Sequence, residues 1–172
     1  MANTGEADVK GIELEAAWRI SRAISSRLAL SYNDGETASG EPLRSVNPAS
    51  AVFGLRYDAA SWDLTANISY SAAKKAKDAY NADGSDAATY PYLTDSYTVV
   101  DLMANYDISP QWRLSAGIYN LFDEKYYQWQ RVRFVTNWVG SGVRGGVLPG
   151  GEGLQRYSEP GRYAKLAISY VF

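Results

Sequence analysis

The chain has 172 residues, one domain's worth of sequence at about 150 residues per domain. Its 17 basic and 19 acidic residues give a formal net charge of −2, so no basic surface points to a nucleic-acid partner. Cys and His are both absent, which excludes disulfide frameworks, thiol nucleophiles and any mechanism that needs an imidazole. The 14 Tyr and 5 Trp outnumber 4 Phe, and such amphipathic rings are typical of a boundary between an apolar medium and water.

The beginning of the chain has neither the basic region nor the apolar core of a secretory signal, and no stretch approaches the ~20 apolar residues of a membrane-spanning helix. Seven segments instead alternate apolar and polar residues with the period of two that predicts β-strands. In chain order they are residues 12–18, 28–32, 51–57, 62–70, 100–106, 112–118 and 166–172. Since successive strand side chains point to opposite faces, one face of the sheet is apolar and uncharged while the other is polar. The sequence predicts an all-β fold.

The connections between these segments alternate in length. Short turns follow Trp18, Tyr57 and Tyr106, whereas long polar loops follow Tyr32, Tyr70 and Ile118. Turns that are short at one end and loops that are long at the other are typical of outer-membrane barrels. Aromatic residues stand at both ends of the segments: Trp18, Tyr57, Trp62, Tyr106, Trp112 and Phe172 on the short-turn side, Tyr32 and Tyr70 on the other.

A soluble β-sandwich or lipocalin-like barrel would alternate as well, with its apolar face turned inward. The aromatic strand ends, the small residues of the polar face and the one-sided loops favour lipid on the apolar side. We therefore predict an antiparallel transmembrane β-barrel in the bacterial outer membrane.

The final strand carries apolar residues at every second position and ends on an aromatic residue. These residues are Leu166, Ile168, Tyr170 and Phe172. The pattern resembles the C-terminal signature that the barrel-assembly machinery recognises in bacterial outer-membrane proteins. Seven strands would leave an open edge in lipid, where each unpaired backbone group costs several kcal/mol. We therefore expect residues 1–172 to be the C-terminal segment of a larger barrel.

Specific strings then resemble a known family. Residues 3–15 are similar to a strand entry of TonB-dependent outer-membrane receptors, and Asn120, Leu121, Phe122, Asp123 and Tyr126 are similar to their "N-L-F-D-x-x-Y" segment. Within that superfamily, residues 40–48, 126–133 and 156–162 most resemble haem and haemoglobin receptors. The last of these strings contains Pro160, Gly161 and Arg162.

The resemblance implies a 22-stranded barrel occluded by a plug, which takes up haem or another iron complex and is energised through TonB. This chain would supply the last seven strands, without the plug, and would carry out transport and no catalysis. The implied partners are outer-membrane lipid, lipopolysaccharide, the rest of the barrel and plug, TonB, and haem or a haem protein. Haem would be the cargo and not a resident cofactor.

Haem receptors of this kind typically ligate iron through His, which this chain lacks. A ligand from this chain would have to be a tyrosine such as Tyr80, Tyr90 or Tyr92, although solvated loop tyrosines are the favoured interpretation. Lys74, Lys75 and Lys77 are expected either to meet lipopolysaccharide phosphates or to be solvated.

Three further patterns have structural explanations. Residues 140–145 spell G-x-G-x-x-G, but in a Gly-rich loop where no helix can start, so a dinucleotide site is not expected. Residues 81–86 carry oxygen ligands, yet their spacing favours a polar turn over a calcium loop. Glu13 and Glu15 share the polar face and are more simply lumen-lining charges than an acid–base pair.

Two other functional classes remain open. A small autonomous barrel acting as an anchor or adhesin would need an eighth strand within residues 130–148, where residues 131–139 alternate briefly. An outer-membrane hydrolase would need a nucleophile–base pair, and none is evident in the sequence.

Overall fold

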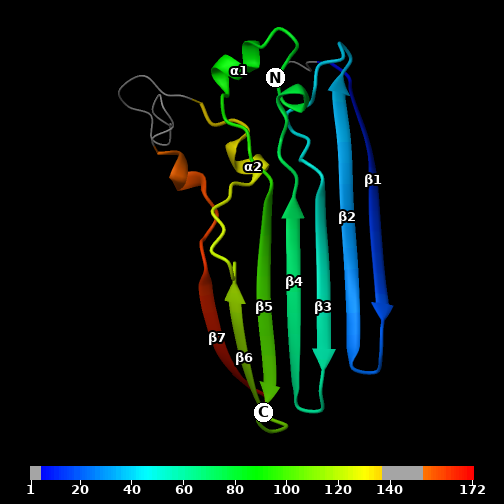
Figure 1. The fold of residues 1–172 in the computed structure, drawn as a ribbon, viewed down its shortest axis with the longest axis vertical. Coiled ribbons are helices and arrows are strands. Elements are labelled where there is room, and N and C mark those ends of the chain that lie inside the picture. Colours follow the sequence, from blue (N-terminus) through cyan, green and yellow to red (C-terminus); the bar gives the residue numbers. More distant parts are fainter. Residues whose placement is uncertain (1–4, 137–152) are drawn as a thin grey trace.

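The computed structural model describes residues 5–136 and 153–172. Seven strands form one antiparallel sheet whose spatial order is the chain order (Figure 1). The strands are β1 (Ala7–Arg19), β2 (Ile24–Thr37), β3 (Ser50–Asp58), β4 (Trp62–Ser71), β5 (Tyr97–Asp107), β6 (Trp112–Tyr119) and β7 (Tyr163–Tyr170). The predicted all-β, seven-stranded antiparallel architecture is confirmed.

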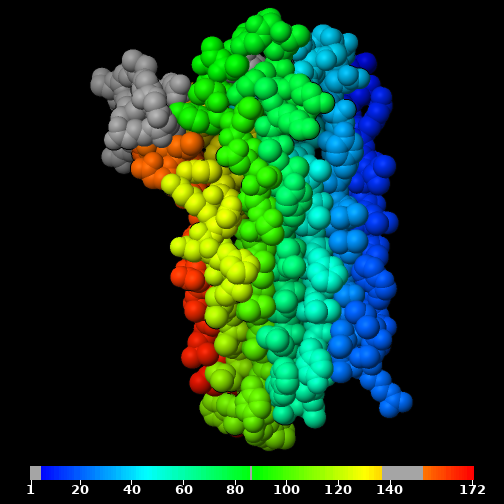
Figure 2. Space-filling model, viewed as in Figure 1, coloured from blue at the N-terminus to red at the C-terminus, as the bar shows by residue number. Residues whose placement is uncertain are grey.

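The register of the strands aligns the apolar positions in rows across the sheet. Leu102 of β5 lies opposite Ala66 of β4 and Ile118 of β6, and Leu114 of β6 lies opposite Ile168 of β7. This apolar face is open to its surroundings, with Ile12 73% exposed and Leu166 72% exposed. Figure 2 shows the strands side by side as an elongated wall with the loops gathered at one end. A sheet that leaves its apolar residues uncovered has the surface that a bilayer requires.

The connections have the predicted asymmetry. Residues 20–23, 59–61 and 108–111 form short turns at one end, while residues 38–49, 72–96 and 120–162 connect the strands at the other. β1 and β2 extend further toward the long-loop end than the alternation indicated, since Ala7 still pairs with Thr37. Backbone pairing continues there beyond the regular alternation of apolar side chains that marked the strands in the sequence.

Short helices occur only in the long loops within the described residues. They are η1 (Ala76–Asp78), α1 (Ser85–Thr89), α2 (Trp129–Val132) and η2 (Leu154–Tyr157). Across residues 5–136 and 153–172, no helix has the length and apolar character needed to cross a membrane.

The extra strand considered for residues 131–139 is wrong where the structure describes it. α2 includes Arg131 and Val132, and Val135 packs into a buried cluster with Ala79 and Trp129. The brief alternation does not follow burial, because Val132 and Val135 are buried while Phe134 is 58% exposed. Residues 137–139 lie outside the described part, as does the G-x-G-x-x-G string at 140–145.

Candidate functional site

The polar face of the sheet carries a network of paired charges near the short turns. Arg56 Nε lies 2.7 Å from Asp58 Oδ1, and its Nη2 lies 3.1 Å from Asp63 Oδ2. Asn105 Nδ2 donates to Asp63 Oδ1 at 2.9 Å, and Ser115 Oγ donates to Asn105 Oδ1 at 2.7 Å. These bonds join β3, β4, β5 and β6 across one face, which is the arrangement expected of a wall that lines an aqueous interior.

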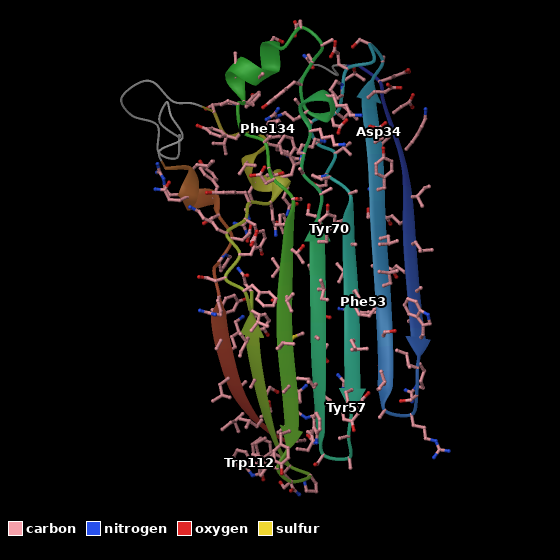
Figure 3. The ribbon with its side chains drawn as sticks, in the orientation of Figure 1. Asp34, Phe53, Tyr57, Tyr70, Trp112 and Phe134 are labelled. Atoms are coloured by element: carbon pink, nitrogen blue, oxygen red, sulfur yellow. The ribbon has the colours of Figure 1, made fainter. Side chains whose placement is uncertain are left out.

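The apolar face ends in aromatic contacts at the short-turn side. The ring centroids of Tyr57 and Trp62 are 5.1 Å apart, and those of Trp112 and Tyr170 are 4.7 Å apart. Figure 3 shows Tyr57 and Trp112 at this end and Tyr70 toward the other. The two bands match the predicted positions and the girdles that flank the apolar zone of membrane barrels.

The residues proposed as a barrel-assembly signature share this apolar face. Leu166, Ile168 and Tyr170 lie opposite Ala116, Leu114 and Trp112. Phe172 follows β7, and its ring centroid lies 5.1 Å from that of Tyr170. The placement leaves all four side chains accessible, and their role in assembly remains a prediction.

The structure brings most of the predicted family-motif residues together at the base of the last long loop. Asn120 is 3% exposed and takes a left-handed conformation, with φ of 51°. Its Nδ2 donates to the carbonyls of Glu124 at 2.8 Å and Pro160 at 3.2 Å, while its Oδ1 accepts from Glu124 N at 2.8 Å. The backbone N–H of Asn120 donates to Asp101 Oδ1 at 2.8 Å. One amide therefore ties the first residues of the loop to its last residues.

Asp123 makes a second tie at the same place. Its Oδ1 accepts from the Arg162 N–H at 2.7 Å, and a Cβ on Gly161 would lie 2.6 Å from that oxygen. Gly161 therefore leaves room for the carboxylate. Phe122, by contrast, points outward and is 71% exposed.

We predict that Asn120→Ala opens this loop base. The variant loses three side-chain hydrogen bonds and keeps a strained positive φ, so about 2 kcal/mol of local stability should be lost. Asn120→Gly removes the same bonds but relieves the strain, and should be the milder change. Hydrogen exchange of the backbone amides around residues 121–124 measures both. Equal protection in Asn120→Ala and the parent protein would contradict the assignment.

A set of tyrosines occupies the polar face at the long-loop end, and the sequence interpretation missed it. The ring centroids of Tyr97 and Tyr126 are 4.3 Å apart, and those of Tyr119 and Tyr163 are 4.9 Å apart with the planes at 13°. The sequence could have placed Tyr119 and Tyr163 on the polar face, because each is adjacent in sequence to a residue of the apolar face. The contact itself depends on strand register.

Burial, reinforced by the negative charge of Glu159, raises the pKa of Tyr126 from 10.0 to about 12. The neutral phenol is thus favoured in the folded loop, so the stabilisation is fully present below pH 10 and is lost as the pH rises from 10 to about 12. Burial also raises the pKa of Tyr92, so we predict that a near-ultraviolet titration will show late-ionising tyrosines whose number falls by one in Tyr126→Phe. An unchanged titration curve in that variant would contradict the assignment.

The buried centre of the long loops is Arg44, which is 9% exposed. Its guanidinium carbon lies 4.9 Å from the ring centroids of Tyr90 and Trp129 and 5.3 Å from that of Tyr80. Nη1 donates to the Ala79 carbonyl at 3.1 Å and Nη2 to the Tyr90 carbonyl at 3.2 Å, while Nε donates to the carbonyl of Arg133. One cation therefore joins all three long loops.

Trp129 and Lys74 complete this loop cluster. Trp129 Nε1 donates to the Arg44 carbonyl at 2.9 Å, and Lys74 Nζ donates to the Val46 carbonyl at 2.9 Å. Lys74 is only 6% exposed, and burial lowers the pKa of its ammonium. The expectation that Lys74 is solvated or bound to phosphate is therefore wrong. Lys77 is exposed, and its Nζ lies 3.8 Å from Asp78 Oδ1.

The structure also corrects the expectation that Tyr80, Tyr90 and Tyr92 are solvated loop residues. Tyr80 and Tyr90 are not free loop residues, because their rings flank Arg44 and Tyr80 Oη donates to the Tyr90 carbonyl at 3.1 Å. Tyr92 packs against the same cluster. The sequence shows several aromatic residues in one long loop, but no local pattern identifies Arg44 as the residue that they contact.

Residues 81–84, which were considered for a calcium loop, form a turn. Gly84 has φ of 72° and its N–H donates to the Asn81 carbonyl at 2.9 Å. In the part of the chain that the structure describes, no group of three or more acidic residues is arranged to hold a metal ion.

Comparison with known proteins identifies the relatives of this architecture. Residues 1–121 match the family model described as "TonB dependent receptor-like, beta-barrel". Hemoglobin-haptoglobin utilization protein B of Neisseria meningitidis is 30% identical over 99% of this chain and 22% of its own length. A probable hemoglobin and hemoglobin-haptoglobin-binding protein of Haemophilus influenzae is 28% identical over 99% of this chain and 18% of its own length.

Solved structures support the fold. The copper transporter OprC superposes with a TM-score of 0.72 and 24% identity, covering 96% of this chain and 23% of that protein. The ferripyoverdine receptor of the outer membrane of Pseudomonas aeruginosa superposes with a TM-score of 0.62 and 16% identity, covering 95% and 19%. This chain therefore spans about a fifth of the length of these relatives.

Proposed function

Because this chain belongs to the TonB-dependent receptors, which are transporters of the bacterial outer membrane and not enzymes, we propose that it forms one wall of a receptor that takes up haem or another iron complex. In this proposal, residues 1–172 supply the last strands of the barrel. The plug and the segment that engages TonB belong to other parts of the same receptor.

The observation that carries the cargo assignment is the similarity, over 99% of the chain, to proteins named for the utilization or the binding of haemoglobin and haemoglobin-haptoglobin. The structure adds a wall with two chemically distinct faces and an ordered cluster of long loops at one end. In this proposal the Arg44 loop cluster lies outside the cell, where haem or a haem protein would first meet the receptor. The apolar face would contact membrane lipid and lipopolysaccharide.

The sheet itself supports a larger barrel. β1 and β7 each pair with one neighbour in the described residues, and an unpaired edge in lipid costs several kcal/mol per exposed backbone group. Further strands of the receptor would pair with these edges.

The function is tested by growth. A strain that cannot synthesise haem and lacks its own haem receptors should grow on haem or haemoglobin when it expresses the receptor that contains this segment. Growth should disappear when TonB is deleted. A receptor that reaches the outer membrane but supports growth neither on haem or haemoglobin in this strain, nor on a ferric siderophore in a haem-synthesising strain without siderophore receptors, would contradict the proposed function. Growth on the siderophore alone would show that the cargo is the other iron complex.

A further inference from the structure

Three residues form an aromatic, charged surface on the polar face near the long loops. Tyr119 of β6 and Tyr163 of β7 are register partners, and their rings stack with centroids 4.9 Å apart. Lys165 lies one step along the same face of β7, with its Nζ 5.4 Å from the centroid of each ring. The ammonium is thus held over two aromatic faces at once.

Gly117 is what allows the Tyr119 ring to lie against the wall. It is the register partner of Lys165, and a Cβ at this position would lie 2.8 Å from Cε2 of Tyr119. The Tyr119 ring therefore leans over Gly117 and lies along the wall. Any larger residue at this position would push the ring away from the wall.

Within the seven strands of this chain the surface is accessible, and no acidic side chain pairs with its charge. Tyr163 is 39% exposed, and Lys165 is exposed along the same strand. Among the described residues, no carboxylate lies within ion-pairing distance of Lys165, while Arg56 and Arg113 on the same face each have an aspartate partner. Lys165 therefore differs from these arginines in having its charge open to a ligand.

We propose that Tyr119, Tyr163 and Lys165 form a binding surface for a flat conjugated ligand that carries carboxylates. The aromatic rings stack on the conjugated plane, and the Lys165 ammonium pairs with a carboxylate at its edge. The inference rests on the proposed function, since haem is the member of this chemical class that the receptor would transport. It assigns this chain a direct contact with the cargo that involves no iron ligand.

The test uses the complete receptor that contains this segment, purified in detergent, and absorbance titrations with three porphyrins. Haem carries the carboxylates and the iron, haem dimethyl ester lacks the free carboxylates, and protoporphyrin lacks the iron. The variants are Tyr163→Leu, Tyr163→Phe and Lys165→Gln. The control is Ser169→Ala, which changes the same face of β7 nearer the short turns. Retained heat-modifiability shows that each variant is folded.

The expected pattern follows from the chemistry of each contact. Tyr163→Leu should weaken binding of all three porphyrins by about tenfold, because a stacking plane is lost, and Tyr163→Phe should bind normally. Lys165→Gln should weaken haem and protoporphyrin by roughly fivefold and leave the dimethyl ester unchanged. Ser169→Ala should have no effect.

The failures are distinguishable. A parent receptor that binds none of the three porphyrins contradicts haem as the cargo in the proposed function. If the parent binds haem and folded Lys165→Gln loses nothing, the carboxylate contact is wrong. If Tyr163→Leu loses haem but not protoporphyrin, the tyrosine acts on the iron and the stacking surface is wrong. If Tyr163→Leu fails to fold, Lys165→Gln still tests the binding surface, because Lys165 is exposed and its substitution should leave the fold intact.

Discussion

Arg44→Ala is expected to separate the three long loops while leaving the strands intact. The substitution removes the donor to one buried and two partly buried carbonyls, and it empties the space between three aromatic rings. Hydrogen bonds from a charged donor are worth more than neutral ones, and each buried acceptor left without a partner costs about 1–3 kcal/mol. We expect the loop cluster to lose about 4 kcal/mol of local stability, allowing for partial access of water.

Limited proteolysis of cells that display the receptor measures this loss. The loops of Arg44→Ala should be cut rapidly, while hydrogen exchange in β3 to β6 should stay slow. Arg44→Lys keeps the charge and cannot reach three carbonyls with one ammonium, so its loss should be intermediate. Lys77→Ala is the control, because Lys77 is exposed outside the cluster. Equal cleavage of Arg44→Ala and Lys77→Ala would show that Arg44 does not organise the loops.

Leu102→Arg is expected to destabilise the barrel through the membrane. Leu102 lies in the middle of β5, in the apolar row between Ala66 and Ile118. An arginine on the lipid face near the bilayer midplane costs about 2–4 kcal/mol. Its long side chain would have to reach toward the headgroups and disturb the surrounding lipid.

The neighbouring residue gives a matched control. Met103 is adjacent in sequence but faces the polar side with Asp101 and Asn105, so Met103→Arg should cost far less. Urea unfolding in lipid vesicles, followed by the shift of the folded band in electrophoresis, compares the two variants. If Met103→Arg were the more damaging change, the assignment of the two faces would be reversed.

Strand alternation was readable from the sequence because it is a local property of a sheet with two different surroundings. Trp62, Leu64 and Ala66 alternate with polar residues since each neighbour faces the opposite side, and the register then confirmed their rows. The short and long connections were readable for the same reason. The ends of β1 and β2 were not, because backbone pairing beyond the apolar band needs no side-chain pattern.

The motif residues around Asn120 were found as a string, but their action depends on distant partners. Asn120 bonds to Pro160, which lies 40 positions away, and Asp123 to Arg162, which lies 39 away. Nothing in the spacing of the string indicates that one amide closes the loop. The end of α2 fell within the extra strand considered for residues 131–139, because four residues are too few to show a helical period.

By itself, the sequence determined the all-β architecture, the two faces of the sheet and the membrane that one face requires. These features depend on the alternation of side chains and on loop length, which are local properties of the chain. Only the tertiary structure decided that Arg44 binds three loops and that Tyr119, Tyr163 and Lys165 meet. These contacts join residues that are close in space through strand register and loop packing. Their geometry exists only once the strands have paired.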